Sequence, residues 1–310
     1  MDGGISLGMS YSHIVADGKS LWDFMVAWGE CARGCRIGAA TLPPIHDRER
    51  LALNGPPSEH EANRYKAKMQ KCRADNHPKV FEQPPKALMQ CVFVLPASSI
   101  KKLKAEAGGS YTTYEVLCAH FWQRVTEARQ SSRDTKLRFM VVANLRSKMD
   151  PPLPSSYFGN VIHLSTAYAL TGDLLDEELG HTAERIHEAV LACTHESLVS
   201  CLHWLELHGN SFEEIRNDST GYDMMGVVSS PRFPVYDVEF GWGRPDAVRP
   251  AKVRGNGEMV LFGGRLGNDA KAGAGDIEIC MALPSNAMEG LLSDPTFLAK
   301  PVSNPFYYYN

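Results

Sequence analysis

The stretch YSHIVADGKSLWDFMVAW, residues 11–28, joins a predicted strand to a predicted helix. Before it, over residues 5–11, apolar side chains alternate with glycine and serine, the period of two that is typical of a strand with one buried face. After it, apolar side chains recur at helical spacing over residues 21–32, and Ser20 is the expected N-cap. His13 is therefore predicted to lie where a strand ends and a helix begins.

His13 and Asp17 lie four residues apart, and Gly18 follows the acid. A carboxylate at this spacing can fix a turn, and a neutral imidazole can accept a proton from a hydroxyl or an amine. The pattern points to His13 as a general base. H-x-x-x-D-G is nevertheless a short string in a chain with 11 histidines. An ordinary surface or core histidine is the alternative interpretation.

Strands and helices alternate irregularly along the rest of the chain, which favours an α/β fold with mixed sheets. Periodicity and turn residues predict strands over residues 89–95, 137–143, 227–228, 259–262 and 276–283. They predict helices that begin at Ser99 and at Thr112 or Thr113, and helices over residues 177–207 and 286–292. Residues 151–160, PPLPSSYFGN, are expected to form an ordered, proline-stiffened loop.

The chain has 310 residues, enough for about two domains. A polar, proline-rich stretch over residues 41–85 is the best candidate for a crossing between them, with a short charged helix from Glu59 to Cys72. We place an N-terminal part at residues 1–53, the crossing at 54–88 and a C-terminal domain at 89–310.

Composition indicates a folded soluble protein, since 44% of the residues are hydrophobic and 22% are charged. A formal net charge of -4 gives no electrostatic reason to expect nucleic acid or a membrane as a partner. No signal peptide or membrane-spanning run is evident. The eight cysteines are scattered without a CxxC pair, so we expect buried, reduced thiols and a cytoplasmic location.

Two competing sites are disfavoured by the same patterns. A metal at His13 and Asp17 needs a third ligand at motif spacing, and the sequence has no HExxH, so no metal site is predicted. GISLG, residues 4–8, matches the G-x-S-x-G of a nucleophile elbow. That elbow requires a strand before the serine and a helix after it. Here the serine falls inside the predicted strand, so chance explains the match.

A further motif, EFGWGRP, occupies residues 239–245. Gly241 and Gly243 flank Trp242, which predicts a turn where the backbone approaches closely and one large aromatic side chain is anchored. Taken alone, this stretch is a structural turn.

Together and in this order, these stretches resemble the BAHD acyltransferases, the plant coenzyme A-dependent family that makes esters and amides in specialised metabolism. SHIVADG is similar to its HxxxD motif, RSKMDPPLPSSYFGN to the segment that ends in YFGN, and EFGWGRP to its DFGWG motif. The similarity runs from residue 3 to about residue 299. It implies the two-domain fold with mixed sheets that this family shares with chloramphenicol acetyltransferase.

The resemblance implies a role for each motif. His13 would be the general base that deprotonates the acceptor, a small alcohol or amine, for attack on an acyl-CoA bound in a tunnel between two domains. Asp17 would point away from the substrate and form a salt bridge with Arg146, so that Asp17, Gly18 and Arg146 support the site. The motif residues Glu239, Phe240, Gly241, Trp242 and Gly243 would be structural. Acyl-CoA is the implied co-substrate, with no bound cofactor and a monomeric chain.

Three departures from the family pattern affect these expectations. Glu239 replaces an aspartate, and Ser230 stands where some hydroxycinnamoyl transferases carry a tryptophan near the acceptor, so that acceptor is not carried over. The family's histidine lies well inside its chain, whereas here it is residue 13. We therefore expect much of the N-terminal domain to be missing and the chain alone to be poorly active.

Two other functions stay open at this point. The first is a truncated, non-catalytic remnant that only binds a ligand or a partner. The second is an enzyme like chloramphenicol acetyltransferase or the dihydrolipoamide acyltransferases, which have a similar HxxxDG string. EFGWGRP argues against the second, because those families lack that motif.

Overall fold

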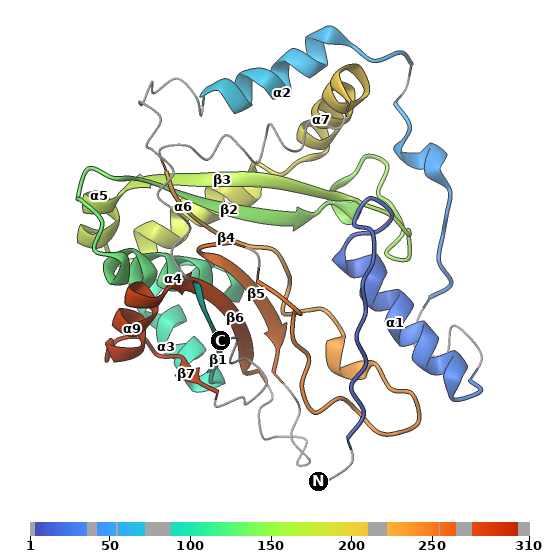
Figure 1. Cartoon of the computed structure of the whole chain (residues 1–310). Helices are drawn as coiled ribbons and strands as arrows, with labels where there is room; N and C mark the ends of the chain where they lie inside the picture. The colour runs from blue at the N-terminus through green and yellow to red at the C-terminus, as the bar shows by residue number, and fades with distance from the viewer. Residues whose placement is uncertain are drawn as a thin grey trace.

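The computed structural model describes residues 4–35, 42–53, 55–71, 88–209, 222–253, 255–264 and 275–302. In this part of the chain one mixed sheet has the strand order β3-β2-β4-β5-β6-β1-β7 (Figure 1). Its pairs are antiparallel except for β2 with β4 and β4 with β5. The strands are β1 Leu88–Leu95, β2 Lys136–Asn144, β3 Ile162–Leu170, β4 Asp223–Val227, β5 Glu258–Gly263, β6 Ile277–Pro284 and β7 Lys300–Pro301.

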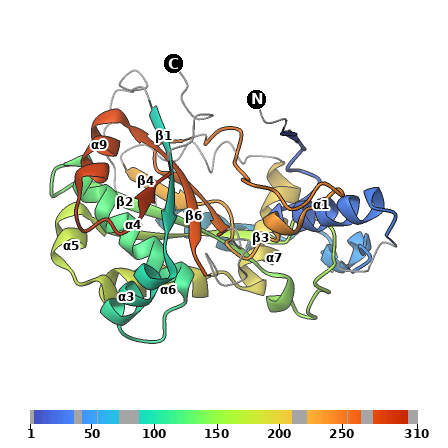
Figure 2. The ribbon, with the colours of Figure 1, turned by 90° about the horizontal axis from the view of Figure 1, so that it is seen from below.

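Helices lie on both faces of this sheet (Figure 2). One face is covered by α3 Ala97–Ala107, α4 Thr113–Arg129, α5 Thr171–Asp176, α6 Leu179–Leu191 and α9 Ser285–Ser293. On the other face lies α1 Gly18–Ala32. α2 Glu59–Lys71 and α7 His195–His208 pack against each other beside β3, where Tyr65 of α2 meets the ring of His163. Short 3₁₀ turns occupy Arg48–Leu51, Arg146–Lys148 and Val235–Asp237. The predicted α/β fold with a mixed sheet is confirmed.

The central strand β6 shows why both faces are covered. Ile279 and Met281 are fully buried against the helices on one face, and Cys280 is fully buried on the other. A strand buried on both faces reads as a continuous apolar run rather than an alternating one. On the Cys280 face, Trp22 of α1 meets the ring of Phe262 edge-on at 6.2 Å, so α1 is packed on the sheet.

The single helix predicted over residues 177–207 is wrong, because α6 and α7 are separated at residues 192–194. Thr194 caps α7: its hydroxyl accepts from the amide of Ser197, and the hydroxyl of Ser197 accepts from the amide of Thr194. This reciprocal capping box satisfies amides that a continuous helix would pair with its preceding turn. Thr112 caps α4 in the same way with Glu115.

The strand predicted over residues 5–11 is also wrong, since residues 4–12 belong to no strand. The alternation predicts which side chains share a face, but a strand also needs a neighbour for its hydrogen bonds. Among the described residues, no strand pairs with this segment. Ile5 and Leu7 are 69% and 50% exposed.

The predicted crossing is partly a packed element. α2 matches the predicted charged helix, with Cys72 outside the described residues. Ala62 and Tyr65 of α2 are buried against Cys201 and Trp204 of α7, so this helix docks on the body of the protein. The boundaries 1–53, 54–88 and 89–310 remain a prediction.

Several smaller predictions also need correction. The helix predicted to open at Ser99 begins at Ala97, and the sequence patterns missed β3 and α5. Cys31 and Cys35 are exposed, contrary to the prediction of buried thiols, although every described cysteine is free.

A buried histidine makes the fold sensitive to acid. His120 of α4 is 5% exposed, its ring stacks on Phe297, and its Nε2 has no hydrogen-bond partner among the described residues. Burial, aided by the charge of Arg124, lowers the pKa of His120 to about 4.

Because burial lowers the pKa of His120, the folded protein is expected to lose stability in mild acid. The unfolded chain takes up the proton below about pH 6.5, whereas the folded chain resists it down to about pH 4. His120 should therefore lower the free energy of unfolding by up to about 3 kcal/mol across this interval. Urea unfolding at several pH values measures this slope, and His120→Gln should flatten it. Equal slopes in both proteins would contradict the assignment.

Candidate active site

Asp17 begins α1. The helix starts at Gly18 and its N-cap is Asp17, whose Oδ1 accepts from the amide of Ser20 at 3.0 Å, so the prediction of Ser20 as N-cap is wrong. A carboxylate suits this position because it also favours the positive end of the helix dipole. Gly18 allows close packing, since a Cβ there would lie 2.7 Å from the ring of Phe233.

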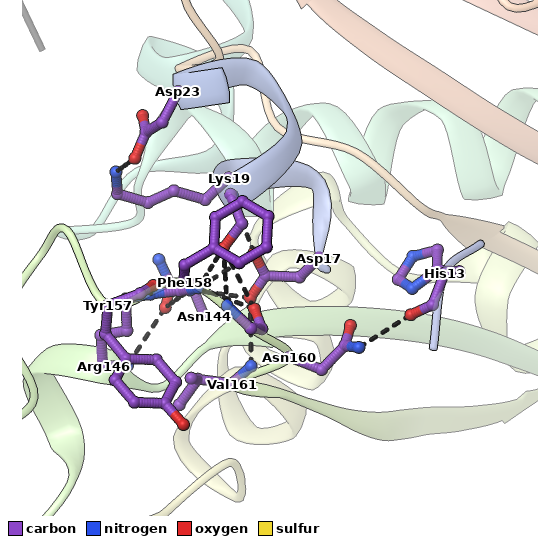
Figure 3. Close-up of polar contacts among 12 residues, drawn as sticks. His13, Asp17, Lys19, Asp23, Asn144, Arg146, Tyr157, Phe158, Asn160 and Val161 are labelled. Carbon is purple, nitrogen blue, oxygen red and sulfur yellow. Dashed lines mark hydrogen bonds and ion pairs between the residues drawn. The ribbon is translucent and has the colours of Figure 1, made fainter. Parts of the chain in front are cut away.

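The predicted ion pair between Asp17 and Arg146 is present in the structure (Figure 3). Arg146 Nη1 donates to Oδ2 at 2.8 Å and Nη2 donates to Oδ1 at 3.0 Å, which is a bidentate pair. The side chain of Asp17 is 1% exposed and that of Arg146 is 3% exposed. The amide of Val161 also donates to Oδ2 of Asp17, at 3.1 Å. The carboxylate is therefore occupied by Arg146, Ser20 and Val161.

The other hydrogen bonds of Arg146 go to β2, to the segment that follows it and to α1. Nε donates to the carbonyl of Tyr157 at 3.1 Å, and Nη1 donates to Oδ1 of Asn144 at 3.0 Å. Nη2 is shared with the hydroxyl of Ser20 and the carbonyl of Gly159, both at 3.0 Å. A buried ion pair offsets its desolvation only when its donors are satisfied in this way.

The loop over residues 151–160 is ordered, as the sequence predicts, and lies between α1 and residues 45–48. Ile45 pairs with it on one side: its amide donates to the carbonyl of Ser156 at 3.0 Å, and its carbonyl accepts from the amide of Phe158 at 2.9 Å. The guanidinium of Arg48 donates to the carbonyl of Phe158 and lies over the ring of Tyr157. These contacts hold the loop in place beside the start of α1.

His13 lies in a turn over residues 13–15 and is exposed, not at the end of a strand as predicted. The amide of Val15 donates to the carbonyl of Ser12 across the turn at 3.1 Å. The backbone carbonyl of His13 accepts from Asn160 Nδ2 at 2.7 Å. Figure 3 shows the carboxylate of Asp17 turned toward Arg146, with the ring of His13 on the other side. The imidazole is therefore exposed, with the ring of Tyr11 5.6 Å away, and takes no part in the pair of Asp17 and Arg146.

The EFGWG segment contacts the far end of α1. A Cβ on Gly29 would lie only 2.3 Å from the carbonyl oxygen of Glu239, and the guanidinium of Arg33 donates to that same oxygen. The Glu239 carboxylate lies 3.9 Å from Arg33, and Phe240 meets Trp28 edge-on at 5.1 Å. This motif thus fixes the position of the helix that begins at Asp17.

The prediction that Trp242 is an anchored aromatic is wrong. Its side chain is 66% exposed and stacks on Phe240 with ring centres 5.8 Å apart. Gly241 and Gly243 have φ of 99° and 96°, a backbone conformation that side-chain-bearing residues rarely adopt. The glycines form the predicted turn, while Glu239 and Phe240 make the contacts with α1.

Gly29→Ala is expected to destabilise the protein by roughly 1 to 3 kcal/mol, because the added methyl overlaps a backbone carbonyl. Gly290→Ala in α9 is the matched control, since its Cβ would make ordinary contact with Ala128 at 3.5 Å. The control should be neutral or more stable by up to about 1 kcal/mol, as alanine favours helices. Thermal unfolding of both variants provides the comparison. Equal effects would show that α1 is not docked at Gly29.

Sequence reasoning missed the contributions of Ser20 as a hydrogen-bonding partner of Arg146 and of Asn160 as a partner of His13. The signal for Asn160 was its position at the end of the YFGN string. In the described ranges no group of three potential metal ligands is found, and no described helix is long and apolar enough to span a membrane.

The chain is similar in sequence to a known protein family and to several plant acyltransferases. The family model described as "Transferase family" matches residues 1–298. Hydroxycinnamoyltransferase of Narcissus pseudonarcissus is 30% identical over 292 residues, which are 92% of this chain and 65% of that protein. Shikimate O-hydroxycinnamoyltransferase of Nicotiana tabacum is 32% identical over 268 residues, 84% of this chain and 60% of that protein. The chain thus spans less than two thirds of the length of these relatives.

Solved structures share the fold. Vinorine synthase superposes with a TM-score of 0.61 at 21% identity, over 90% of this chain and 59% of that one. TRI101 of F. sporotrichioides, complexed with coenzyme A and T-2, gives a TM-score of 0.65 at 16% identity, over 93% and 65%. At these identities the likeness concerns the fold alone.

Proposed function

Because this chain belongs to the BAHD acyltransferase family, we propose that it transfers an acyl group from a coenzyme A thioester to an alcohol or an amine. The names of its relatives, several of which are hydroxycinnamoyltransferases, make an aromatic acyl-CoA the first donor to test. The plant specialised metabolism named by the resemblance is the proposed setting.

His13 acts as the general base in this proposal. Its Nε2 or Nδ1 lone pair accepts the proton of the acceptor's hydroxyl or amine while that oxygen or nitrogen forms a bond to the thioester carbonyl carbon. The carbonyl oxygen becomes an oxyanion. When the oxyanion collapses, the carbon–sulfur bond breaks, and the imidazolium gives its proton to the departing thiolate, which leaves as the coenzyme A thiol. The exposed ring at the turn before α1 supports this role.

The observation that carries the proposal is the buried pair of Asp17 and Arg146. The Asp17 carboxylate accepts from Arg146 twice and from the amides of Ser20 and Val161, so its lone pairs are used within the fold. Asp17 therefore supports the turn and does not act on the substrate. Gly18 and Arg146 share this supporting role, and the segment over residues 239–243 supports the other end of α1.

The cellular setting is also proposed. The described cysteines are free, which agrees with the reducing cytoplasm predicted from the sequence. We propose a monomer, with acyl-CoA and a small acceptor as its binding partners and without a resident cofactor.

Acyl transfer is tested with the protein in excess over hydroxycinnamoyl-CoA or acetyl-CoA, with and without a panel of alcohols and amines. The proposal predicts release of the coenzyme A thiol and an acylated acceptor of matching mass, whatever the absolute rate. Thiol release that does not depend on the acceptor would contradict the proposal. Binding of acyl-CoA without any release would instead support the binding-only alternative.

A further inference from the structure

Asn160 connects the loop over residues 151–160 to the turn that carries His13 (Figure 3). Its Nδ2 donates to the carbonyl of His13 at 2.7 Å and to the carbonyl of Ile14 at 3.0 Å. Because both partners are carbonyls, which only accept, they fix which end of the carboxamide faces the turn. One side chain thus uses both of its amide hydrogens on two successive backbone groups.

Packing of side chains contributes little to the shape of this turn. Ile14 is 81% exposed and Val15 is 55% exposed. The turn contains the backbone hydrogen bond from Val15 to Ser12, and it joins α1 at Asp17, whose amide donates to the carbonyl of Gly159 at 3.3 Å. The two hydrogen bonds from Asn160 are therefore a large share of what holds residues 13 and 14 in place.

The carboxamide of Asn160 makes hydrogen bonds through its nitrogen and none through its oxygen among the described residues. Oδ1 of Asn160 is buried and has no hydrogen-bond partner in the described part of the chain. A buried acceptor left unpaired costs stability, and such groups in folded proteins usually have a specific reason. In Asn160 the oxygen is left unpaired, while the nitrogen donates to both carbonyls of the turn.

We propose that Asn160 is a positioning residue for acyl transfer: it holds the backbone of the His13 turn and thereby the direction of the imidazole. This inference rests on the proposed function of His13 as general base. Asn160 touches the backbone of the turn and takes no part in proton transfer. Its loss should lower the rate of the chemical step, since small misplacements of a catalytic group reduce rates strongly.

Asn160→Asp and Asn160→Ala test the inference. Aspartate keeps the shape but replaces the amide donors with oxygens that repel the two carbonyls, and alanine removes the side chain. Both variants should lower kcat by roughly 10- to 100-fold with KM for acyl-CoA close to wild type, and Asn160→Ala should also keep a thermal midpoint close to wild type. Asn256→Asp is the matched control, because Asn256 is exposed and contacts Arg129 far from this turn along the chain. It should leave kcat unchanged.

Hydrogen exchange read by mass spectrometry gives a second measurement that does not need activity. In both Asn160 variants, amides of residues 13–17 should exchange roughly 10-fold faster, while those of residues 21–32 in α1 keep their wild-type rates. Unchanged exchange over residues 13–17 would overturn the inference, and so would an unchanged kcat in an active protein.

The two proposals fail in different ways. If the wild-type protein shows no transfer that depends on His13, the proposed function fails and the exchange data alone decide whether Asn160 holds the turn. If transfer depends on His13 but both Asn160 variants keep the wild-type kcat, only the positioning role is wrong. If Asn160→Ala exchanges faster everywhere and has a lower thermal midpoint, that would also count against a positioning role.

Discussion

Arg146→Met is expected to lower the free energy of unfolding by about 3 to 5 kcal/mol. The substitution keeps much of the side-chain volume but leaves the Asp17 carboxylate buried without its cation, and a lone buried charge is far more costly than a pair. It also removes the Arg146 donors from the carbonyls of Tyr157 and Gly159, although the carbonyl of Gly159 keeps the hydrogen bonds from Asp17 and Ser20. Urea unfolding followed by circular dichroism measures the change.

Arg133→Met is the matched control for this prediction. Arg133 pairs with Asp176, but the two side chains are 65% and 66% exposed, so the loss should be no more than about 1 kcal/mol. The double variant Asp17→Asn with Arg146→Met should be at least about 1 kcal/mol more stable than the sum of the single effects, because no charge is then left buried. Strict additivity would show that the two residues do not act as a pair.

His13→Ala is expected to lower activity strongly and to leave stability almost unchanged, the reverse of what a structural substitution such as Arg146→Met does to stability. Loss of the general base should lower the rate of acyl transfer by roughly 10²- to 10⁴-fold. The free energy of unfolding should change by no more than about 0.5 kcal/mol, because the ring is exposed and its substitution leaves the buried pair intact. Single-turnover transfer and urea unfolding on the same preparation give both numbers.

His60→Ala controls for the loss of a histidine as such. His60 lies on α2 with its side chain 82% exposed, and its replacement should alter neither transfer nor stability. Equal rates of acyl transfer in His13→Ala and His60→Ala would show that His13 is not the general base.

The side chains proposed to form the site were easier to name from the sequence than the backbone that holds them. A short motif names His13 and Asp17, whereas Arg146 and its pairing with Asp17, 129 residues away in sequence, came from the resemblance and not from periodicity. No local pattern could supply that contact, because it depends on how the segment after β2 meets the start of α1.

The choice of N-cap shows the limit of local signals. Both Asp17 and Ser20 are good capping residues, and the apolar spacing that begins at Leu21 favoured Ser20. Tertiary contacts decide for Asp17, because its carboxylate also meets Arg146 and Val161, while the hydroxyl of Ser20 accepts from the amide of Gly159 at 3.1 Å. The competing hydrogen bonds come from a loop that the local sequence does not contain.

The two wrong element predictions have related causes. Apolar residues recur with helical spacing through both α6 and α7, so periodicity did not show the break that the Thr194 capping box makes. Over residues 5–11 the period of two was read correctly as a pattern, but a strand exists only when another strand supplies its hydrogen bonds. Periodicity describes one segment, whereas both outcomes depend on partners.

The most direct test of His13 as general base is formation of acylated acceptor by His13→Ala, with and without added imidazole, with each product identified by mass. If His13 is the general base, the variant alone should form almost no acylated acceptor, and imidazole in the space left by the ring should restore product in proportion to its concentration. Formation of acylated acceptor by His13→Ala at the wild-type rate without imidazole would contradict it.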